Sequence, residues 1–383
     1  MSINLNDYGF TGAEFLAAQA IIKEKNNGNF IPARVIESRR ELFKVSCEYG
    51  EVTAEIKGSF FHNLEDENPF DEKLSTSDDP ASAKEPLGFP VIGDFVVIRY
   101  NAQGSSLIDS VIKRRSRFSR VDFLGHAEGY AKNVREQVLA ANFDYVFIMT
   151  SLNHDLKLNR ISRYLTAVLQ GGGFPVIILT KADLVDDAGA QIAEVRKIAK
   201  EVPVIAVSSK TGSGLDELSP FLEPSKTVIF LGSSGVGKSS LLNKLAGKDL
   251  MDVKEIRDDD SKGRHTTTYR QLFRLSCGAL VIDTPGIREI GLWDSSEGIS
   301  LAFAEVEELF SGCRFNDCSH QSEPGCAVLA ALEDGSLSEQ KWKNYQAQHK
   351  ENNFVHNHSA YLKQKNAFQK SIAMHNKERR KKV

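Results

Sequence analysis

A nine-residue stretch, residues 232–240, constrains the fold of this chain most strongly, because it fits the pattern G-x-x-x-x-G-K-[S/T]. Its residues in order are Gly232, Ser233, Ser234, Gly235, Val236, Gly237, Lys238, Ser239 and Ser240. An apolar run at 228–231 precedes the stretch, and a run typical of a helix start, 240–245, follows it. This strand–loop–helix setting is the one that a phosphate-binding loop requires. A glycine-rich turn without a ligand is the alternative, and the flanking strand and helix argue against it.

The residue types of this loop suit phosphate. Its glycines let backbone N–H groups close around phosphate oxygens, and the start of the following helix adds positive potential. In such a loop Lys238 is expected to reach the β- and γ-phosphates, and the hydroxyl of Ser239 is expected to ligate Mg²⁺. The sequence therefore predicts a nucleoside triphosphate site with magnesium.

Near-continuous apolar runs, separated by segments of helical character, recur along the second half of the chain. They are 145–149, 176–179, 204–207, 228–231 and 280–282. Such runs are typical of a parallel sheet that helices cover on both faces, and a nucleotide then binds at the carboxyl ends of the strands. We therefore expect an α/β P-loop domain with its site at that edge of the sheet.

Two motifs at those strand ends indicate which base is bound. One consists of Thr180, Lys181, Ala182 and Asp183, and the other of Ser208, Ser209 and Lys210. A carboxylate only accepts hydrogen bonds, so Asp183 suits the N1–H and N2–H donors of guanine and would be left unpaired by adenine. Since charge-assisted hydrogen bonds contribute about 1.5–3 kcal/mol each, the preference for guanine should be large. The Lys181 stem is expected to lie over the base, with Ser209 and Lys210 completing the pocket.

A third motif, residues 283–286, follows the last apolar run. Asp283 is the expected Walker-B carboxylate, which holds Mg²⁺ through water, and Gly286 lets a backbone N–H approach the γ-phosphate. Between the phosphate loop and this motif lies a threonine-rich segment, 263–268. Its Thr267 is our assigned second Mg²⁺ ligand, with Thr266 as the alternative.

The N-terminal part of the chain has a different pattern. Thr11 and Glu14 form a capping box, which predicts a leading helix that Gly28 ends. Five short candidate strands follow, at 34–36, 42–48, 52–56, 91–99 and 107–112. They suit a five-stranded OB-type β-barrel. Such barrels often bind single-stranded nucleic acid or structured RNA, and a barrel that only packs is the alternative.

Two segments near the barrel are strongly charged. Residues 65–85 hold eight acidic residues against two lysines and are rich in Pro, Ser and Asp, which predicts a mobile loop inserted into the barrel. Residues 114–120 hold four arginines and one phenylalanine. We expect them to form a basic linker, which either touches RNA phosphate or is solvated.

Three cysteines and one histidine lie within fourteen residues, in the order Cys313, Cys318, His320 and Cys326. Three thiolates and one imidazole make a closed tetrahedral site of the structural type, so one Zn²⁺ is expected to fold a small helical domain there. Unliganded buried cysteines are the alternative. The remaining two, Cys47 and Cys277, lie in strand patterns and are expected in the core.

Features of the whole chain indicate its cellular compartment and the kind of partner it binds. It has no run of about 18 apolar residues and no basic-then-apolar leader, so we expect a cytoplasmic protein with no membrane partner. Residues 341–383 carry eleven Lys or Arg and two acidic residues, a net charge of +9, although the whole chain has −3. A basic tail on an acidic body predicts an anionic polymer as partner, and a solvated helix or frayed tail is the alternative.

The order of the motifs carries a family resemblance. The base motifs come first, then the phosphate loop, the threonine-rich switch and Asp283, whereas ordinary GTPases begin with the phosphate loop. With a barrel before this permuted set and a Cys/His cluster after it, the chain resembles the ribosome small-subunit-dependent GTPase A family over roughly residues 31–340. The resemblance implies an OB barrel, a circularly permuted GTPase domain and a zinc-binding C-terminal domain. It also implies Mg²⁺-dependent hydrolysis of GTP to GDP, stimulated by the small ribosomal subunit during its late maturation.

Two positions bear on binding and catalysis. The family usually has Asn where Thr180 stands, so we expect weaker nucleotide binding here. Ile287 stands where Ras-type GTPases carry the Gln that orients water. We therefore assign catalysis to His265, which as a neutral imidazole accepts a hydrogen bond from water, together with Lys238 and Thr267. Contact with rRNA, or packing, is the alternative role for His265.

These interpretations divide the chain into a helical leader (1–30), a barrel (31–118), a permuted GTPase domain (119–300) and a zinc-binding domain with a basic helical tail (301–383). The expected protein is a monomer whose partner is the small ribosomal subunit with its rRNA. An RNA-binding protein that uses GTP only as a ligand sensor is the main rival. An ATP-using P-loop enzyme is the second rival, and Asp183 argues against it.

Overall fold

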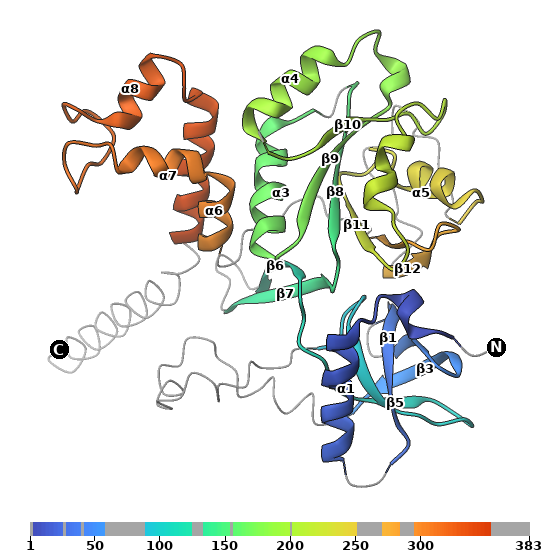
Figure 1. Ribbon diagram of the computed structural model, residues 1–383. Coiled ribbons are helices and arrows are strands. Elements are labelled where there is room, and N and C mark those ends of the chain that lie inside the picture. The colour runs from blue at the N-terminus through green and yellow to red at the C-terminus, as the bar shows by residue number, and fades with distance from the viewer. Residues whose placement is uncertain are drawn as a thin grey trace, which may run out of the picture.

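The structure is a computed structural model that describes the greater part of the chain. The described residues are 3–25, 28–39, 42–57, 89–124, 133–153, 156–199, 201–250, 270–283 and 295–353. The acidic segment 65–85, the threonine-rich segment 263–268, Gly286 and residues 354–383 lie outside these ranges. Figure 1 shows a barrel with a leading helix, an α/β domain and a C-terminal helical unit.

The described chain begins with the short helix η1 (Leu5–Tyr8) and helix α1 (Gly12–Glu24), which pack against the barrel. The predicted capping box is present. The Thr11 hydroxyl accepts from the N–H of Ala13, and the Glu14 carboxylate accepts from the N–H of Thr11 at 2.8 Å. Helix α1 ends at Glu24, before the predicted Gly28, because Lys25 already has non-helical backbone angles.

Five strands close into the predicted barrel. They are β1 (Phe30–Arg39), β2 (Leu42–Cys47), β3 (Gly50–Ile56), β4 (Phe95–Arg99) and β5 (Ser106–Val111). The strand order is β1-β2-β3-β5-β4, and the pairing of β1 with β4 closes the ring around a core that includes Val45 and Ile108. The predicted strand 91–99 begins only at β4. Residues before it form a turn in which the Asp94 carboxylate accepts from the N–H of Val91.

Two antiparallel strands, β6 (Arg117–Leu124) and β7 (Asn133–Ala141), join the barrel to the α/β domain. Of the two alternatives for the basic linker at 114–120, contact with RNA phosphate or solvation, the solvated one is wrong. Phe118 is fully buried in the core of the α/β domain, and the Arg114 guanidinium donates to both oxygens of buried Asp94, at 2.8 and 2.7 Å. The apolar side chain and the ion pair hold this segment against the protein interior.

The α/β domain has the expected parallel sheet. Its strands are β8 (Tyr145–Ser151), β9 (Phe174–Thr180), β10 (Val204–Ala206), β11 (Thr227–Leu231), β12 (Arg270–Arg274) and β13 (Leu280–Asp283). The order is β10-β9-β8-β11-β13-β12, and only β12 is antiparallel to its neighbour. Strand β12 was not predicted, and it also pairs with β1, so barrel and sheet are continuous.

Helices cover both faces of this sheet, as predicted (Figure 1). The helices of the domain are α3 (Leu158–Gln170), η3 (Ala182–Leu184), α4 (Gly189–Ile198), η4 (Asp216–Phe221) and α5 (Lys238–Ala246). Alternate strand residues enter two separate cores: Ile148 and Ile177 pack with α3 and α4, whereas Phe147 and Val176 pack with α5. The site at the strand ends is thereby supported on both sides.

The C-terminal unit is helical. It contains α6 (Ser296–Ala302), α7 (Ala304–Phe310), α8 (Ala327–Glu333) and a further helical stretch over residues 339–353. The unit docks on α3, where the Arg163 guanidinium forms a bidentate pair with Glu351 at 2.5 and 2.9 Å and Gln348 donates to the Ser162 hydroxyl. Among the residues that the structure describes, no helix is long and apolar enough to cross a membrane.

Candidate functional site

The predicted motifs meet at one edge of the sheet. The phosphate loop follows β11, Thr180 ends β9, Ser208 lies just after β10, and Asp283 ends β13. Because β9, β10, β11 and β13 all run in the same direction, these four positions share the carboxyl edge of the sheet. That is where ligands bind in open α/β sheets.

The phosphate loop joins the end of β11 to helix α5, which begins at Lys238. Gly237 is the N-cap with φ of +98°, a backbone conformation that favours glycine, and no side chain caps the helix. The Lys238 ammonium donates to the carbonyl oxygens of Gly232 and Ser233 at 2.6 and 2.8 Å, so it lies within the curve of the loop. A helix start free of a side-chain cap, with an ammonium held inside the loop, fits a phosphate group.

Thr180 connects three segments of the site. Its buried hydroxyl lies 2.6 Å from the carbonyl oxygen of Val236 in the phosphate loop and 3.3 Å from that of Thr150 at the end of β8. The hydroxyl therefore faces the phosphate loop. Thr150 was not among the predicted site residues, and no sequence motif marks it.

The carboxylate of Asp183 is also held in place. The Ser208 hydroxyl donates to Asp183 Oδ1 at 2.6 Å, and the N–H of Thr211 donates to the same hydroxyl at 3.1 Å. Lys181 has φ of +60°, so the backbone turns sharply between Thr180 and Asp183. This network holds the Asp183 carboxylate of η3 at the carboxyl edge of the sheet, between the ends of β9 and β10. Thr211, which donates to Ser208, was missed because the sequence pattern ended at Lys210.

The proposed magnesium and catalytic residues are only partly within the described ranges. Asp283 is buried at the end of β13, beside the phosphate-loop strand, and Gln271 of β12 lies opposite it. Ser239 lies in the first turn of α5. His265, Thr267 and Gly286 lie outside the described residues, so their assignments stay predictions.

The four predicted metal ligands lie together in the C-terminal unit. One ligand atom from each of Cys313, Cys318, His320 and Cys326 lies within 4.8 Å of the others. The Nδ1 atom of His320 is 3.6 Å from the Cys313 sulfur and 3.5 Å from the Cys326 sulfur, and these two sulfurs are 4.0 Å apart. In a tetrahedral Zn²⁺ site with Zn–N bonds of about 2.0–2.1 Å and Zn–S bonds of about 2.3 Å, these ligand atoms lie roughly 3.5–3.8 Å apart. The cluster therefore fits a zinc ion.

Neighbouring groups orient this cluster. The Phe310 ring stacks on His320 at 4.4 Å between centroids, and His320 itself has φ of +58°. The Glu323 carboxylate accepts hydrogen bonds from the Ser319 hydroxyl and from the N–H groups of Ser319, Gln321 and Ser322. The Ser319 hydroxyl, and then these N–H groups, hold the pKa of Glu323 well below its usual range. Sequence reasoning missed Glu323, although a lone acid within a Cys/His spacing is a signal that could be searched for.

The two cysteines outside the cluster differ from each other. Cys47 is fully buried in the barrel, as predicted. The prediction for Cys277 is wrong, because it is exposed in the turn between β12 and β13. The strand pattern there ends at Arg274, before the cysteine.

Comparison with known protein families agrees with this arrangement. The family described as RsgA GTPase matches residues 114–293. A small ribosomal subunit biogenesis GTPase RsgA 2 of Listeria monocytogenes is 43% identical over 343 residues, which cover 90% of this chain and 88% of that protein. A small ribosomal subunit biogenesis GTPase RsgA of Methanosarcina acetivorans is 46% identical over 257 residues, covering 67% of this chain and 68% of the relative.

Two solved structures share the fold. YjeQ from Thermotoga maritima superposes with a TM-score of 0.57 at 24% identity, over 84% of this chain and 98% of that one. YloQ, described as a circularly permuted GTPase, superposes with a TM-score of 0.53 at 22% identity, over 85% of this chain and 95% of that one. Both agree with the barrel and the permuted strand order found here.

Proposed function

Since this chain belongs to the RsgA GTPase family, we propose that it hydrolyses GTP during small ribosomal subunit biogenesis, and that the small subunit stimulates the reaction. The relatives named above carry that role in their names. The observation that supports the proposal most strongly is the held Asp183 carboxylate at the carboxyl edge of the sheet, the edge that also carries the phosphate loop, since the Ser208 hydroxyl donates to its Oδ1 atom at 2.6 Å. A fixed carboxylate at this edge selects guanine, whose edge offers two donors.

The residues of the site have distinct tasks. The phosphate loop and Lys238 bind the β- and γ-phosphates. Ser239 and Thr267 would ligate Mg²⁺ and Asp283 would hold it through water; the ion would neutralise charge on the transferred phosphoryl group. Lys181, Ser209 and Lys210 complete the base pocket around Asp183. These assignments follow from the motifs and from the shared strand edge.

We assign the positioning of the attacking water to His265. The residue that follows Gly286 is Ile287, which has no polar group to orient water. His265 is adjacent in sequence to the threonines that would close over Mg²⁺, and a neutral imidazole accepts a hydrogen bond near physiological pH. Contact of His265 with rRNA is the competing assignment.

The other parts of the chain bind the ribosome or hold the fold. The Cys/His cluster binds one structural Zn²⁺, and the barrel and the basic tail contact rRNA. The protein works as a monomer in the cytoplasm. A tail with eleven basic residues against two acidic ones suits a polyanion such as rRNA.

The test is GTP turnover by the purified chain with small subunits, with large subunits and with neither. We expect slow turnover alone, strong stimulation by small subunits and none by large subunits. Equal turnover in all three mixtures, together with subunit binding that depends on GTP, would instead support an RNA-binding protein that uses GTP as a ligand sensor.

A further inference from the structure

Barrel strand β1 has two partners along one edge. Its first half, from Phe30 to Arg34, pairs with β4 and closes the barrel. Its second half pairs with β12 of the GTPase domain, Glu37 opposite Gln271 and Ser38 opposite Arg270. One strand therefore belongs to both domains.

A bulge lies between the two paired stretches of β1. The pairing of β1 with β2 shifts register between Val35 and Glu37, so Ile36 is an extra residue on β1. Ile36 is buried in the same core cluster as Leu272 of β12 and Ile282 of β13, whereas Val35 is buried in the barrel core. Because successive side chains of a strand point to opposite faces, Val35 and Ile36 enter the cores of two domains.

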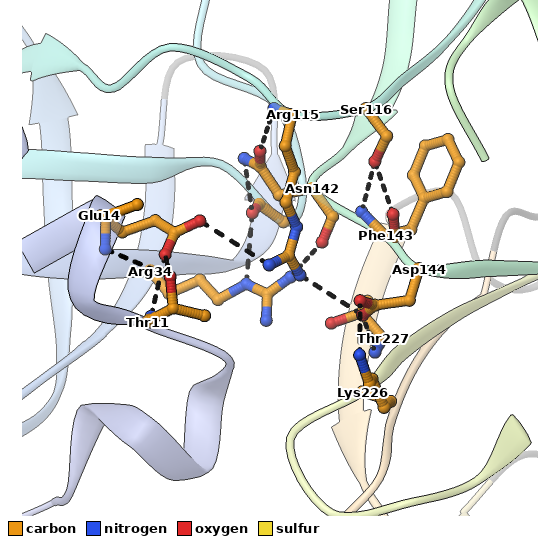
Figure 2. Close-up of polar contacts among 12 residues, drawn as sticks. Thr11, Glu14, Arg34, Arg115, Ser116, Asn142, Phe143, Asp144, Lys226 and Thr227 are labelled. Atoms are coloured by element: carbon orange, nitrogen blue, oxygen red, sulfur yellow. Dashed lines mark hydrogen bonds and ion pairs between the residues drawn. The ribbon is translucent and has the colours of Figure 1, made fainter.

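A buried arginine fixes the start of this shared stretch (Figure 2). The Arg34 guanidinium is fully buried and donates to the carbonyl oxygens of Gly93, Asn142 and Tyr8 at 3.2, 2.8 and 2.5 Å. These carbonyls come from the barrel, from the β7–β8 connection and from η1. Because a buried guanidinium must keep its acceptors, any sliding of the barrel on the GTPase domain would be costly.

Gly93 leaves no space at the same junction. Its φ is +86°, and a Cβ placed on it would lie 2.2 Å from the Ala141 carbonyl oxygen and 3.0 Å from Ile282. The N–H of Ala141 in turn donates to the carbonyl oxygen of Ile92 at 3.0 Å. The barrel turn is therefore in direct backbone contact with the GTPase domain.

Around this contact Arg115 extends the network. Its guanidinium lies 3.3 Å from Asp144 at the start of the GTPase sheet and 3.6 Å from Glu14 of α1 (Figure 2). Asp144 also accepts from the N–H of Thr227 at the start of β11. Arg115 and Asp144 thus connect the leading helix and the phosphate-loop strand at the amino edge of the sheet. The second half of β1 lies at the opposite, carboxyl edge.

Strand β12 is where this rigid junction meets the nucleotide site. Its Gln271 lies between Glu37 of the barrel and Asp283, the predicted Walker-B carboxylate. In sequence, a single residue, Tyr269, separates the threonine-rich segment from β12. We propose that β1 is a positioning element of the GTPase site. Through β1, binding of a ligand to the barrel is coupled to the position of β12 beside Asp283. By reciprocity, the bound nucleotide must then change the affinity of the barrel for its ligand.

This inference rests on the proposed function for the barrel's ligand, the small subunit, but its first test needs no ribosome. Amide hydrogen exchange is compared in the full chain with GDP and with a non-hydrolysable GTP analogue. We expect protection to change in β12 and, together with it, in residues 37–39 of β1, while β3 stays unchanged. A change in β12 alone, or in neither segment, would overturn the coupling and leave the proposed GTPase activity intact.

The second test uses a matched pair of variants. Ile36→Ala removes the β1 side chain that packs in the core of the GTPase domain, and Ile108→Ala makes the same change in the barrel core, away from the junction. For each we measure the ratio of small-subunit affinities with the GTP analogue and with GDP. We expect a ratio of about fivefold or more in the wild type and in Ile108→Ala, and a ratio near one in Ile36→Ala. A ratio retained in Ile36→Ala, or lost equally in both variants, would contradict the proposal, and the exchange experiment still decides if Ile36→Ala fails to fold.

Discussion

Thr180 stands where the family usually has Asn, and its hydroxyl contacts the phosphate loop. The hydroxyl donates to the Val236 carbonyl oxygen at 2.6 Å, so the base motif and the phosphate loop are joined in this chain. The sequence predicted weaker binding from the loss of the carboxamide, and it gave no means of seeing where the remaining hydroxyl would point.

Removing that hydroxyl should weaken binding of both GDP and GTP. Thr180→Val keeps the shape of the side chain but leaves a buried carbonyl without its donor, at a cost of about 1–3 kcal/mol. Since a tenfold change in Kd corresponds to about 1.4 kcal/mol, we expect the Kd for GDP to rise roughly tenfold. Thr180→Ser, which keeps the hydroxyl, should bind almost normally. Equal Kd values for the two variants, measured with a fluorescent nucleotide, would show that the hydroxyl does not position the loop.

His265 should affect turnover and not binding. His265→Ala, measured at saturating small subunits, is expected to lower stimulated GTP turnover by roughly a hundredfold, the usual scale for a lost acid–base or positioning group. Binding of GTP and of subunits should stay intact. Full stimulated turnover would reject the assignment, and loss of subunit binding would favour contact with rRNA.

At the scale of elements, the sequence predicted the buried strands well and the exposed ones poorly. Apolar runs such as 176–179 and 228–231 lie in central parallel strands, where both faces are covered and the pattern is unambiguous. Strand β12 was not predicted, because it lies next to the barrel and its sequence mixes Arg270 and Arg274 with apolar residues. The β6–β7 pair was missed because its arginines were taken as a sign of a basic linker, whereas Arg114 before it forms an ion pair with the buried carboxylate of Asp94.

The loop that carries the metal ligands makes an element-scale prediction. Glu323 accepts N–H groups from both sides of His320, so it holds the loop in the shape that brings the ligands together. Glu323→Gln keeps the size but loses the charge and one acceptor oxygen, and zinc should then be released faster to a chelator. Asp334→Asn changes a similar exposed carboxylate, which accepts from Ser336 outside the cluster, and serves as the control. Equal rates of zinc release for the two variants would contradict the role of Glu323.

At the scale of the whole molecule, the short strand patterns predicted the barrel, the order of motifs predicted the permuted sheet, and the Cys/His spacing predicted the metal cluster. None of these signals predicted that β1 would pair with β12, because a two-residue contact between distant strands leaves no periodic signal. The bulge at Ile36 cannot be recognised from the sequence either, since Val35 and Ile36 are both apolar. Contacts between domains depend on three-dimensional geometry, which neither the residue composition nor the spacing of motifs reveals.

The basic tail makes a prediction about the whole assembly. Removing residues 376–383 deletes five Lys or Arg and one Glu. If these residues neutralise rRNA phosphates, fewer counterions are released on binding, so subunit affinity should fall and its dependence on salt should flatten. Affinity is measured at several salt concentrations for the full and the shortened chain. Identical slopes would mean that the tail is only solvated.

The central claim is that this chain hydrolyses a guanine nucleotide held by Asp183 when the small subunit is present. Asp183→Asn replaces an acceptor with a donor, which suits the C2 carbonyl of xanthine in place of the guanine amino group. The measurement is hydrolysis of xanthosine triphosphate and of GTP by Asp183→Asn with purified small subunits. The account predicts that subunits stimulate turnover of xanthosine triphosphate, while stimulated GTP turnover falls far below that of the wild type. Undiminished GTP turnover, with no gain for xanthosine triphosphate, would contradict it.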